Sequence, residues 1–147
     1  AKNEKSGPEP IKSEIVSLSA GKEKLDVAIS GGLLGVATQL DPSLTKADGL
    51  VGNIVGHVGK MPPTHTELNI QYSLFDRVDF ENPSIKQGES LVISIGTATT
   101  IGVVDKIKKD TVHILLRRIV CAPKGARVAI SRRVGQRWRL SGAGKLL

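Results

Sequence analysis

The residues best suited to chemistry are the cations in the C-terminal third of the chain. The last acidic residue is Asp110, and beyond it stand nine basic residues: Arg117, Arg118, Lys124, Arg127, Arg132, Arg133, Arg137, Arg139 and Lys145. A field of one sign attracts a polyanion, and the planar fork of arginine fits phosphate oxygens better than an ammonium group does. We therefore predict nucleic-acid phosphate as the ligand and the seven arginines of this set as its contacts, in preference to a merely solvated surface.

Trp138 stands between Arg137 and Arg139 and admits two interpretations. An exposed indole could stack on a nucleobase while the flanking guanidinium groups hold phosphates. In a regular strand, however, Trp138 shares a face with Leu140 and points into the core, which leaves the two arginines outside. We favour the core position.

Residues for catalysis or metal binding are sparse. The single cysteine, Cys121, excludes an internal disulfide and a cysteine-built zinc site, and its apolar neighbours predict a small core side chain. The three histidines, His57, His65 and His113, lack the spacing of metal ligands. We expect no catalytic residue and no metal site in this chain.

Two fragments imitate nucleotide-binding signatures. The run SGAGK at 141–145 lacks the glycine-to-lysine spacing of a phosphate-binding loop and is followed by leucine instead of Ser or Thr. The run TKAD at 45–48 has Thr where the guanine-reading motif has Asn. We expect neither to bind a nucleotide.

The composition is that of a soluble globular protein, with 39% hydrophobic and 24% charged residues and a net charge of +7. No run approaches the roughly 20 apolar residues of a bilayer span, and the lysine-rich start has no signal-peptide core. These features predict a cytoplasmic protein that does not contact a membrane.

The first sixty residues carry the patterns of strands. Apolar alternation predicts them at 11–19, 25–30, 33–40 and 50–58. Gly31 and Gly32 permit backbone conformations that other residues avoid, and Asp41-Pro42 opens a short helical-type turn. Four strands are fewer than a side-chain-filled barrel usually needs, so this group is expected to be incomplete.

A proline-rich junction at 59–63 precedes a second group of strands. They are predicted at 67–75, 90–96, 100–107, 111–122, 127–134 and 137–147. In the first of them Leu68, Ile70, Tyr72 and Leu74 should face inward. Short strands joined by Gly, Pro and Asp turns predict an all-β fold of antiparallel barrel or sandwich type.

Six stretches of the chain resemble the gamma subunit of archaeal and eukaryotic translation initiation factor 2. They are IVSL at 15–18, GGLLGVATQLDPSLTKADGLVGNIVG at 31–56, Pro62-Pro63, TELNIQYSLFDRV at 66–78, VISIGTATTIGVV at 92–104 and RVAISRRVGQRWRLSGAGK at 127–145. The last also resembles the end of the third domain of elongation factor Tu. Ala143 departs from the pattern, because the family usually has an aromatic residue there.

The resemblance implies a domain organisation. Residues 1–10 would be a flexible lead-in, residues 11–60 the C-terminal part of the second β-barrel of such a factor, and residues 64–147 its third β-barrel. The GTPase domain, with its GTP and Mg²⁺, would lie upstream, so catalysis would belong to the parent protein and no cofactor to this chain.

The resemblance also implies partners: initiator methionyl-tRNA, the alpha and beta subunits of the factor, and the small ribosomal subunit. The tRNA-acceptor side of the second barrel would be formed by Gly31, Gly32, Leu33, Gly35, Val36 and Thr38. Glycines at this corner suit either close approach of a ligand to the backbone or tight packing. The alternatives are a self-standing basic β-barrel, either RNA-binding or ribosomal, and a purely structural spacer.

Overall fold

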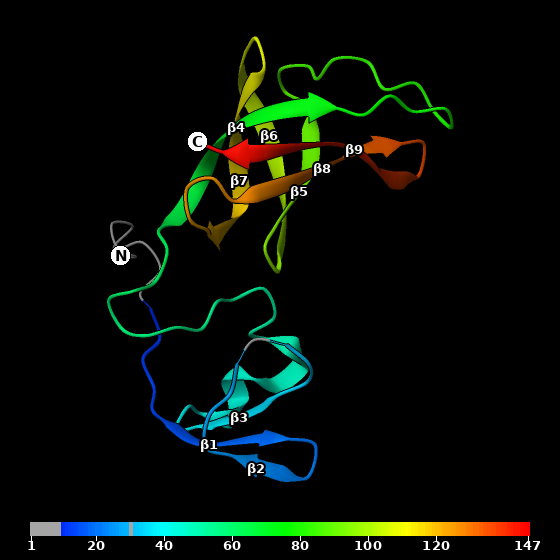
Figure 1. Ribbon diagram of the computed structural model, residues 1–147. Coiled ribbons are helices and arrows are strands. Elements are labelled where there is room, and N and C mark those ends of the chain that lie inside the picture. The colour runs from blue at the N-terminus through cyan, green and yellow to red at the C-terminus, as the bar shows by residue number, and fades with distance from the viewer. Residues whose placement is uncertain (1–9, 30) are drawn as a thin grey trace. The chain divides into compact units, whose positions relative to one another are not determined.

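The computed structural model describes residues 10–29 and 31–147. Its regular elements are strands and two short 3₁₀ helices, so the predicted all-β fold is confirmed (Figure 1). The chain divides into two compact units, one ending at Leu50 and the other beginning at Val51. The predicted boundaries of the lead-in and the two barrels, at 10, 60 and 64, stay predictions.

The first unit is a three-stranded antiparallel sheet of order β2-β1-β3. Its strands are β1 (Ile15–Ala20), β2 (Glu23–Leu25) and β3 (Gly35–Thr38). Leu18 in the central strand lies opposite both Leu25 and Val36, which forms an apolar row across one face. No described residue from 10 to 60 is buried, so the row covers no core of its own.

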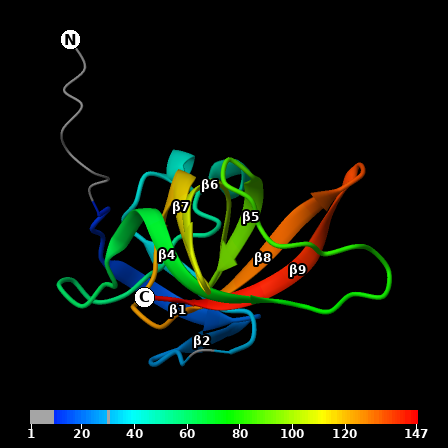
Figure 2. The same ribbon diagram turned by 90° about the horizontal axis from the view of Figure 1, so that it is seen from above.

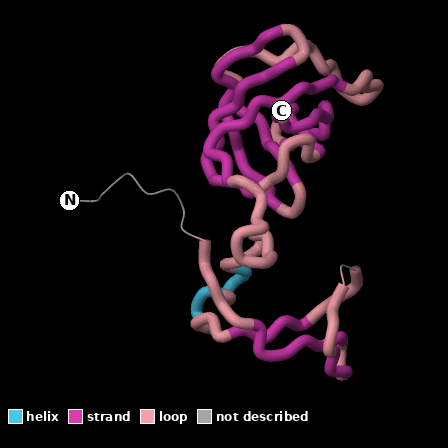
Figure 3. The backbone as a smooth tube through the Cα atoms, turned by 60° about the vertical axis from the view of Figure 1, so that its left-hand side comes forward, coloured by secondary structure: helices cyan, strands magenta, loops and turns pink. Residues whose placement is uncertain are grey.

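The predicted helical-type turn after Asp41 is confirmed as two 3₁₀ helices, η1 (Pro42–Leu44) and η2 (Lys46–Asp48), drawn in cyan in Figure 3. The Asp41 carboxylate accepts a 2.8 Å hydrogen bond from the backbone N–H of Ser43, which lowers the pKa of Asp41 below its ordinary value. This bond satisfies a donor that the start of the helix would otherwise leave free.

The prediction of a strand over residues 50–58 is wrong. Gly52 takes a φ of +88° and turns the chain, and these residues form no strand. Val51, Val55 and Val58 are accordingly exposed. The valines suggested a strand, but a strand needs a hydrogen-bonding neighbour, and β-propensity does not supply one.

The second unit is a closed antiparallel barrel. Its strands are β4 (Thr64–Leu74), β5 (Ser90–Ile95), β6 (Ala98–Lys108), β7 (Thr111–Cys121), β8 (Arg127–Val134) and β9 (Arg137–Leu146). Their order around the barrel is β4-β7-β6-β5-β8-β9, and β9 pairs with β4 to complete it (Figures 1 and 2). Closure leaves these six strands without a free edge.

The barrel holds the hydrophobic core of the described chain. Fourteen buried apolar residues form one cluster, and all of them lie between positions 68 and 146. Leu68 and Ile70 are buried, and Tyr72 and Leu74 pack against the cluster, as the alternation of β4 predicts.

The β8–β9 hairpin changes register near its middle. Ile130 pairs with Gly142 but Ser131 pairs with Leu140, so Ser141 is an extra residue in β9. Beyond this bulge the strands continue as the pairs Arg132–Arg139, Arg133–Trp138 and Val134–Arg137. Figure 2 shows this end of the hairpin extending away from the other strands of the barrel.

Candidate nucleic-acid interface

Arg132 must be removed from the predicted phosphate contacts, because its guanidinium is used inside the barrel unit. Only 8% of the residue is exposed. Nε donates to Glu89 Oε1 at 2.6 Å and Nη2 to Oε2 at 3.0 Å, while Nη1 donates to Asn82 Oδ1 and to the Pro83 carbonyl. Arg132 therefore fastens the connection between β4 and β5 to the hairpin, and its donors are unavailable to RNA.

Trp138 is the second correction, because the side chain predicted to lie in the core is 42% exposed and Leu140 is 46% exposed. The prediction assumed a regular strand in which Trp138 and Leu140 share the inward face. The bulge at Ser141 breaks that phase, and residues 137–140 are all exposed. Stacking on a nucleobase requires an exposed indole, and Trp138 meets that requirement.

Arg133 lies directly opposite Trp138 in the hairpin, so the two side chains share a face. The Arg133 guanidinium reaches over the turn, with Nε donating to the Gly135 carbonyl at 3.3 Å and Nη2 to Gln136 Oε1 at 3.4 Å. This face of the hairpin end presents a cation beside an exposed indole.

Arg137 and Arg139 lie on the other face, together with the buried Arg132. The pKa of Asp79 is lowered mainly by Arg77, whose Nε and Nη2 each donate to Asp79 at 2.9 Å, and to a smaller degree by the charge of Arg139. Asp79 thus offsets part of the charge of Arg139. Arg137 is exposed and has no side-chain hydrogen bond or ion pair to the described residues.

Arg117 and Arg118 occupy a different wall of the barrel. They lie on β7 where its pairing with β4 shifts between His65 and Glu67, and both are exposed. In the closed order, β7 is separated from β8 by β6 and β5 in one direction and by β4 and β9 in the other. The structure therefore does not bring these two arginines together with those of the hairpin end.

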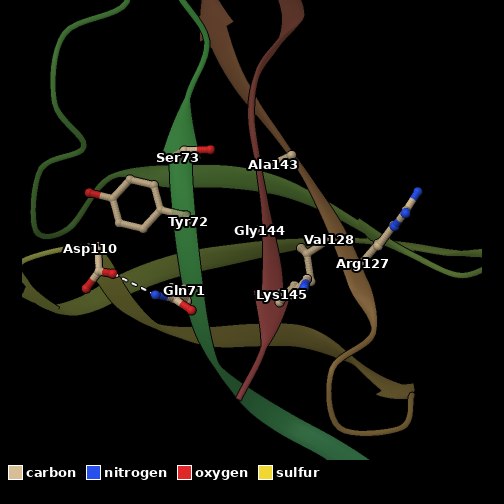
Figure 4. A pocket seen from close by; sticks show the side chains of 9 residues that line it. All are labelled: Gln71, Tyr72, Ser73, Asp110, Arg127, Val128, Ala143, Gly144 and Lys145. Carbon is tan, nitrogen blue, oxygen red and sulfur yellow. Dashed lines mark hydrogen bonds between the residues drawn. The ribbon is translucent and has the colours of Figure 1, made fainter.

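Arg127 stands at the far end of β8 from the turn, beside an open hollow of about 580 Å³ shown in Figure 4. In the register of the sheet, Lys145 lies between Arg127 on β8 and Gln71 on β4. Ala143 contributes only a methyl group to the lining, where the family was expected to have a ring. Two cations above a floor of small residues suit a phosphate group.

Across the same hollow, Gln71 Nε2 donates to Asp110 Oδ2 at 2.8 Å, drawn as the dashed line in Figure 4. This bond is the main cause that lowers the pKa of Asp110 from its ordinary value. The hollow therefore has one cationic side and one anionic side, so an anion would be bound on the Arg127 side.

The six residues predicted for tRNA form one continuous run of the first unit, from the Gly31 bend through β3. Gly31 and Gly32 have φ of +130° and +68°, and a Cβ on either would meet nothing within 4 Å. A Cβ on Gly35 would lie 2.5 Å from Ser19 Oγ. Backbone conformation therefore favours glycine at the first two positions, whereas a Cβ at the third would displace only the rotatable Ser19 hydroxyl.

The other three residues of that run differ in exposure. Leu33 is 90% exposed and Val36 is 47% exposed, whereas Thr38 is half-buried and its Oγ1 accepts from the Leu40 N–H at 3.3 Å. An open glycine backbone followed by an exposed leucine is a surface that a ligand can approach without displacing other groups.

The family of the chain is shown by its relatives. The family model described as initiation factor eIF2 gamma, C terminal, matches residues 66–146. The chain belongs to the eIF2 gamma family. It is 49% identical to the translation initiation factor 2 subunit gamma of Archaeoglobus fulgidus over 97% of its length, 46% identical to that of Halorubrum lacusprofundi over 93%, and 47% identical to that of Pyrococcus furiosus over 92%.

The eIF2 gamma model spans the closed barrel from β4 to β9, and the alignments with whole gamma subunits take in most of the first unit as well. The chain spans about a third of the length of these relatives, 35% for that of Archaeoglobus fulgidus. The resemblance seen in the sequence is thereby confirmed. Among the described residues, no helix is long and apolar enough to cross a membrane.

One charged cluster of this eIF2 gamma barrel was missed from the sequence. His113 on β7 lies 3.0 Å from Asp105 and 3.4 Å from Glu67, measured from its ring nitrogens to the nearest carboxylate oxygens. Asp105 lies on β6 and Glu67 on β4, the two neighbours of β7, so the cluster depends on strand pairing, which no local spacing marks. The residues that the structure describes contain no group suited to hold a metal ion.

Proposed function

We propose that this chain is a binding portion of a translation initiation factor 2 gamma subunit that helps hold initiator methionyl-tRNA and deliver it to the small ribosomal subunit. In this proposal it acts in the cytoplasm, in a GTP-dependent complex with the alpha and beta subunits. GTP, Mg²⁺ and hydrolysis belong to a part of the parent protein outside these residues. The membership of the eIF2 gamma family is the observation that carries the proposal.

The two units have different ligands in this proposal. The run from Gly31 to Thr38 contacts the acceptor end of the tRNA, and its open glycine backbone and exposed Leu33 support that role. The barrel contacts phosphates of ribosomal RNA. Exposed arginines without a side-chain partner among the described residues support this second role: Arg117, Arg118, Arg127 and Arg137.

The tRNA role is tested by filter binding of initiator and elongator methionyl-tRNA to the whole chain and to Leu33→Asp. We expect preference for the initiator and at least a tenfold loss in the variant, because a new carboxylate repels phosphate and removes an apolar contact. Val55→Asp, at an equally exposed valine outside the run, is the matched control. Equal binding of both tRNAs would remove this role from the first unit.

The phosphate role is tested with the double variant Arg127→Ala/Arg137→Ala and RNA from the small ribosomal subunit. Each lost phosphate contact should reduce the slope of log affinity against log salt by about 0.7 to 0.9. Lys22→Ala/Lys24→Ala removes the same charge from the first unit and should leave the slope unchanged. Binding that does not depend on salt would favour the structural spacer instead.

The alternative is a self-standing basic barrel that binds RNA by charge alone. A closed barrel within residues 1–60 would favour it, and the described part of that range forms a three-stranded sheet instead. That protein would bind ribosomal RNA with the same salt slope and would not distinguish the two tRNAs. The first experiment therefore separates it from the main proposal.

A further inference from the structure

The exposed end of the β8–β9 hairpin combines an aromatic ring with several cations. Trp138 is the only tryptophan of the chain, is 42% exposed, and lies opposite Arg133. Leu140 continues the same face two residues further along β9 and is 46% exposed. Two large apolar side chains exposed next to each other among cations make this face a candidate binding surface.

We propose that Trp138 is a stacking platform for an unpaired RNA base, with Arg133, on the same face of the hairpin, binding a phosphate beside that base. The end of the hairpin then prefers single-stranded RNA to duplex RNA. This inference rests on the proposed phosphate role of the barrel and adds to it the kind of RNA that this part of the barrel binds.

The charges favour RNA over a protein as the ligand. Residues 127–147 contain no acidic residue. Among the described residues, Glu89 pairs with the buried Arg132, and Asp79 interacts with Arg139. Asp79 acts on Arg139, whereas Arg133 binds only neutral oxygens of the turn. The cation beside the indole therefore keeps its full charge for an anionic ligand.

The spacing of the groups fits a single strand. Arg133 faces Trp138 from about 5 Å across the pair, on the same face of the hairpin. Arg137 and Arg139 adjoin Trp138 in β9 but lie on the other face, so a base that stacks on the indole has the Arg133 guanidinium beside it for a phosphate. Every base has a π-face, so this contact requires no particular sequence.

Duplex RNA cannot satisfy the same contact. Its bases are already stacked on each other, and the deep narrow major groove of the A-form excludes a side chain as large as indole. The arginines alone would hold a duplex, through its phosphates. The hairpin end should therefore bind duplex by charge and single strand by charge and stacking together.

The single tryptophan makes the contact measurable in the unmodified chain. Titration with a single-stranded RNA should quench and shift the Trp138 fluorescence, and a duplex of the same length should change it little. By filter binding, Trp138→Leu should lose about tenfold or more in affinity for the single strand, while its affinity for the duplex changes less than twofold.

Two variants separate stacking from structure. Trp138→Tyr keeps an aromatic face and should recover most of the lost affinity. Leu115→Ala, at an equally exposed leucine on β7, is the control and should bind single strands like the wild type. Each variant is checked for unaltered denaturant unfolding of the barrel. A loss in Trp138→Leu that Trp138→Tyr does not recover would overturn the stacking contact.

The remaining outcomes distinguish the stacking contact of Trp138 from the proposed binding of RNA phosphates by the barrel. Salt-dependent binding of single strands without quenching, and without loss in Trp138→Leu, would overturn stacking and leave the phosphate role intact. Failure of the wild-type chain to bind either RNA would overturn both. Quenching by poly-glutamate as strong as that by RNA would overturn the inference in favour of an acidic protein partner.

Discussion

The two units contain similar apolar alternation, but in the part of the chain that the structure describes, only the barrel buries its apolar residues in a core. In the barrel every strand has a neighbour on both sides, and fourteen apolar residues are buried. In the first unit β2 and β3 are edges, and Val27, Ile29 and Leu33 are 76%, 81% and 90% exposed. Apolar residues at the correct spacing thus form a core only where the sheet returns to cover them.

This difference also has an energetic meaning. A three-stranded sheet needs a covered apolar face for independent stability, and in the row formed by Leu18, Leu25 and Val36 no residue is fully buried. Stability of the chain should therefore reside in the barrel. The prediction that residues 11–60 belong to a larger barrel stays a prediction.

The largest effect is expected at Arg132. Arg132→Ala leaves the Glu89 carboxylate without its partner and releases Asn82 and the Pro83 carbonyl, and removing one partner of a buried pair costs ~3–5 kcal/mol. Arg133→Ala, one residue along and exposed, should change the free energy of unfolding by less than ~0.5 kcal/mol. Denaturant unfolding measures both free energies. Equal effects of the two substitutions would mean that the contacts of Arg132 add little to the stability of the barrel.

A core deletion in each unit tests the comparison directly. Ile130→Ala in the barrel core should cost ~2–5 kcal/mol, because a fully buried side chain is lost and a cavity remains. Val36→Ala, in the uncovered row, should leave the barrel transition unchanged. A Val36→Ala variant that lowers the barrel stability by a similar amount would contradict the separation of the two units.

Two glycines give the next smaller contrast. A Cβ on Gly144 would collide with the Gln71 carbonyl and lie 2.6 Å from Ile70 Cγ2, so Gly144→Ala should cost ~1–3 kcal/mol by overpacking. Gly35→Ala meets only the rotatable Ser19 hydroxyl in the first unit and should spare the barrel. Thermal unfolding followed by circular dichroism compares the two variants. An equal shift of the barrel transition in both would contradict the expectation that only Gly144→Ala destabilises the barrel.

The smallest expected effect is a change in pH dependence. The hydrogen bond from Gln71 lowers the pKa of Asp110 in the folded chain. The stability that this bond adds is therefore fully present above the ordinary pKa of 3.8, and it is lost as the pH falls through the lower pKa of the folded state. Asp110→Asn should therefore flatten the stability curve of the barrel below about pH 4. Asp41→Asn removes a similarly lowered carboxyl from the first unit and should leave that curve unaltered.

Local patterns were sufficient for most of the barrel. Each of its strands has one face on the core, so alternation such as that of Leu68 and Ile70 carries the information. Alternation failed at residues 26–29 and 50–58, which form no strand, and at Trp138, where one extra residue shifts the phase. These failures depend on pairing with other segments, which the residues of one segment do not specify.

The candidate interface was predictable in charge but not in arrangement. The surplus of arginine was visible, whereas the fate of Arg132 depends on Glu89, a residue in a distant loop. The separation of Arg117 and Arg118 from the hairpin follows from strand order, which the sequence does not state. Adjacent residues such as Arg132 and Arg133 thus acquire opposite roles, one structural and one available to a ligand.

The pairing of β9 with β4 has a consequence for synthesis. Ile70 finds its partner in Leu146, so the ring of strands cannot complete until the last residues of β9 have left the ribosomal tunnel. Until then β4 and β8 each keep an open edge, and contacts between such distant positions form slowly. A nascent chain halted before β9 would therefore be vulnerable to aggregation.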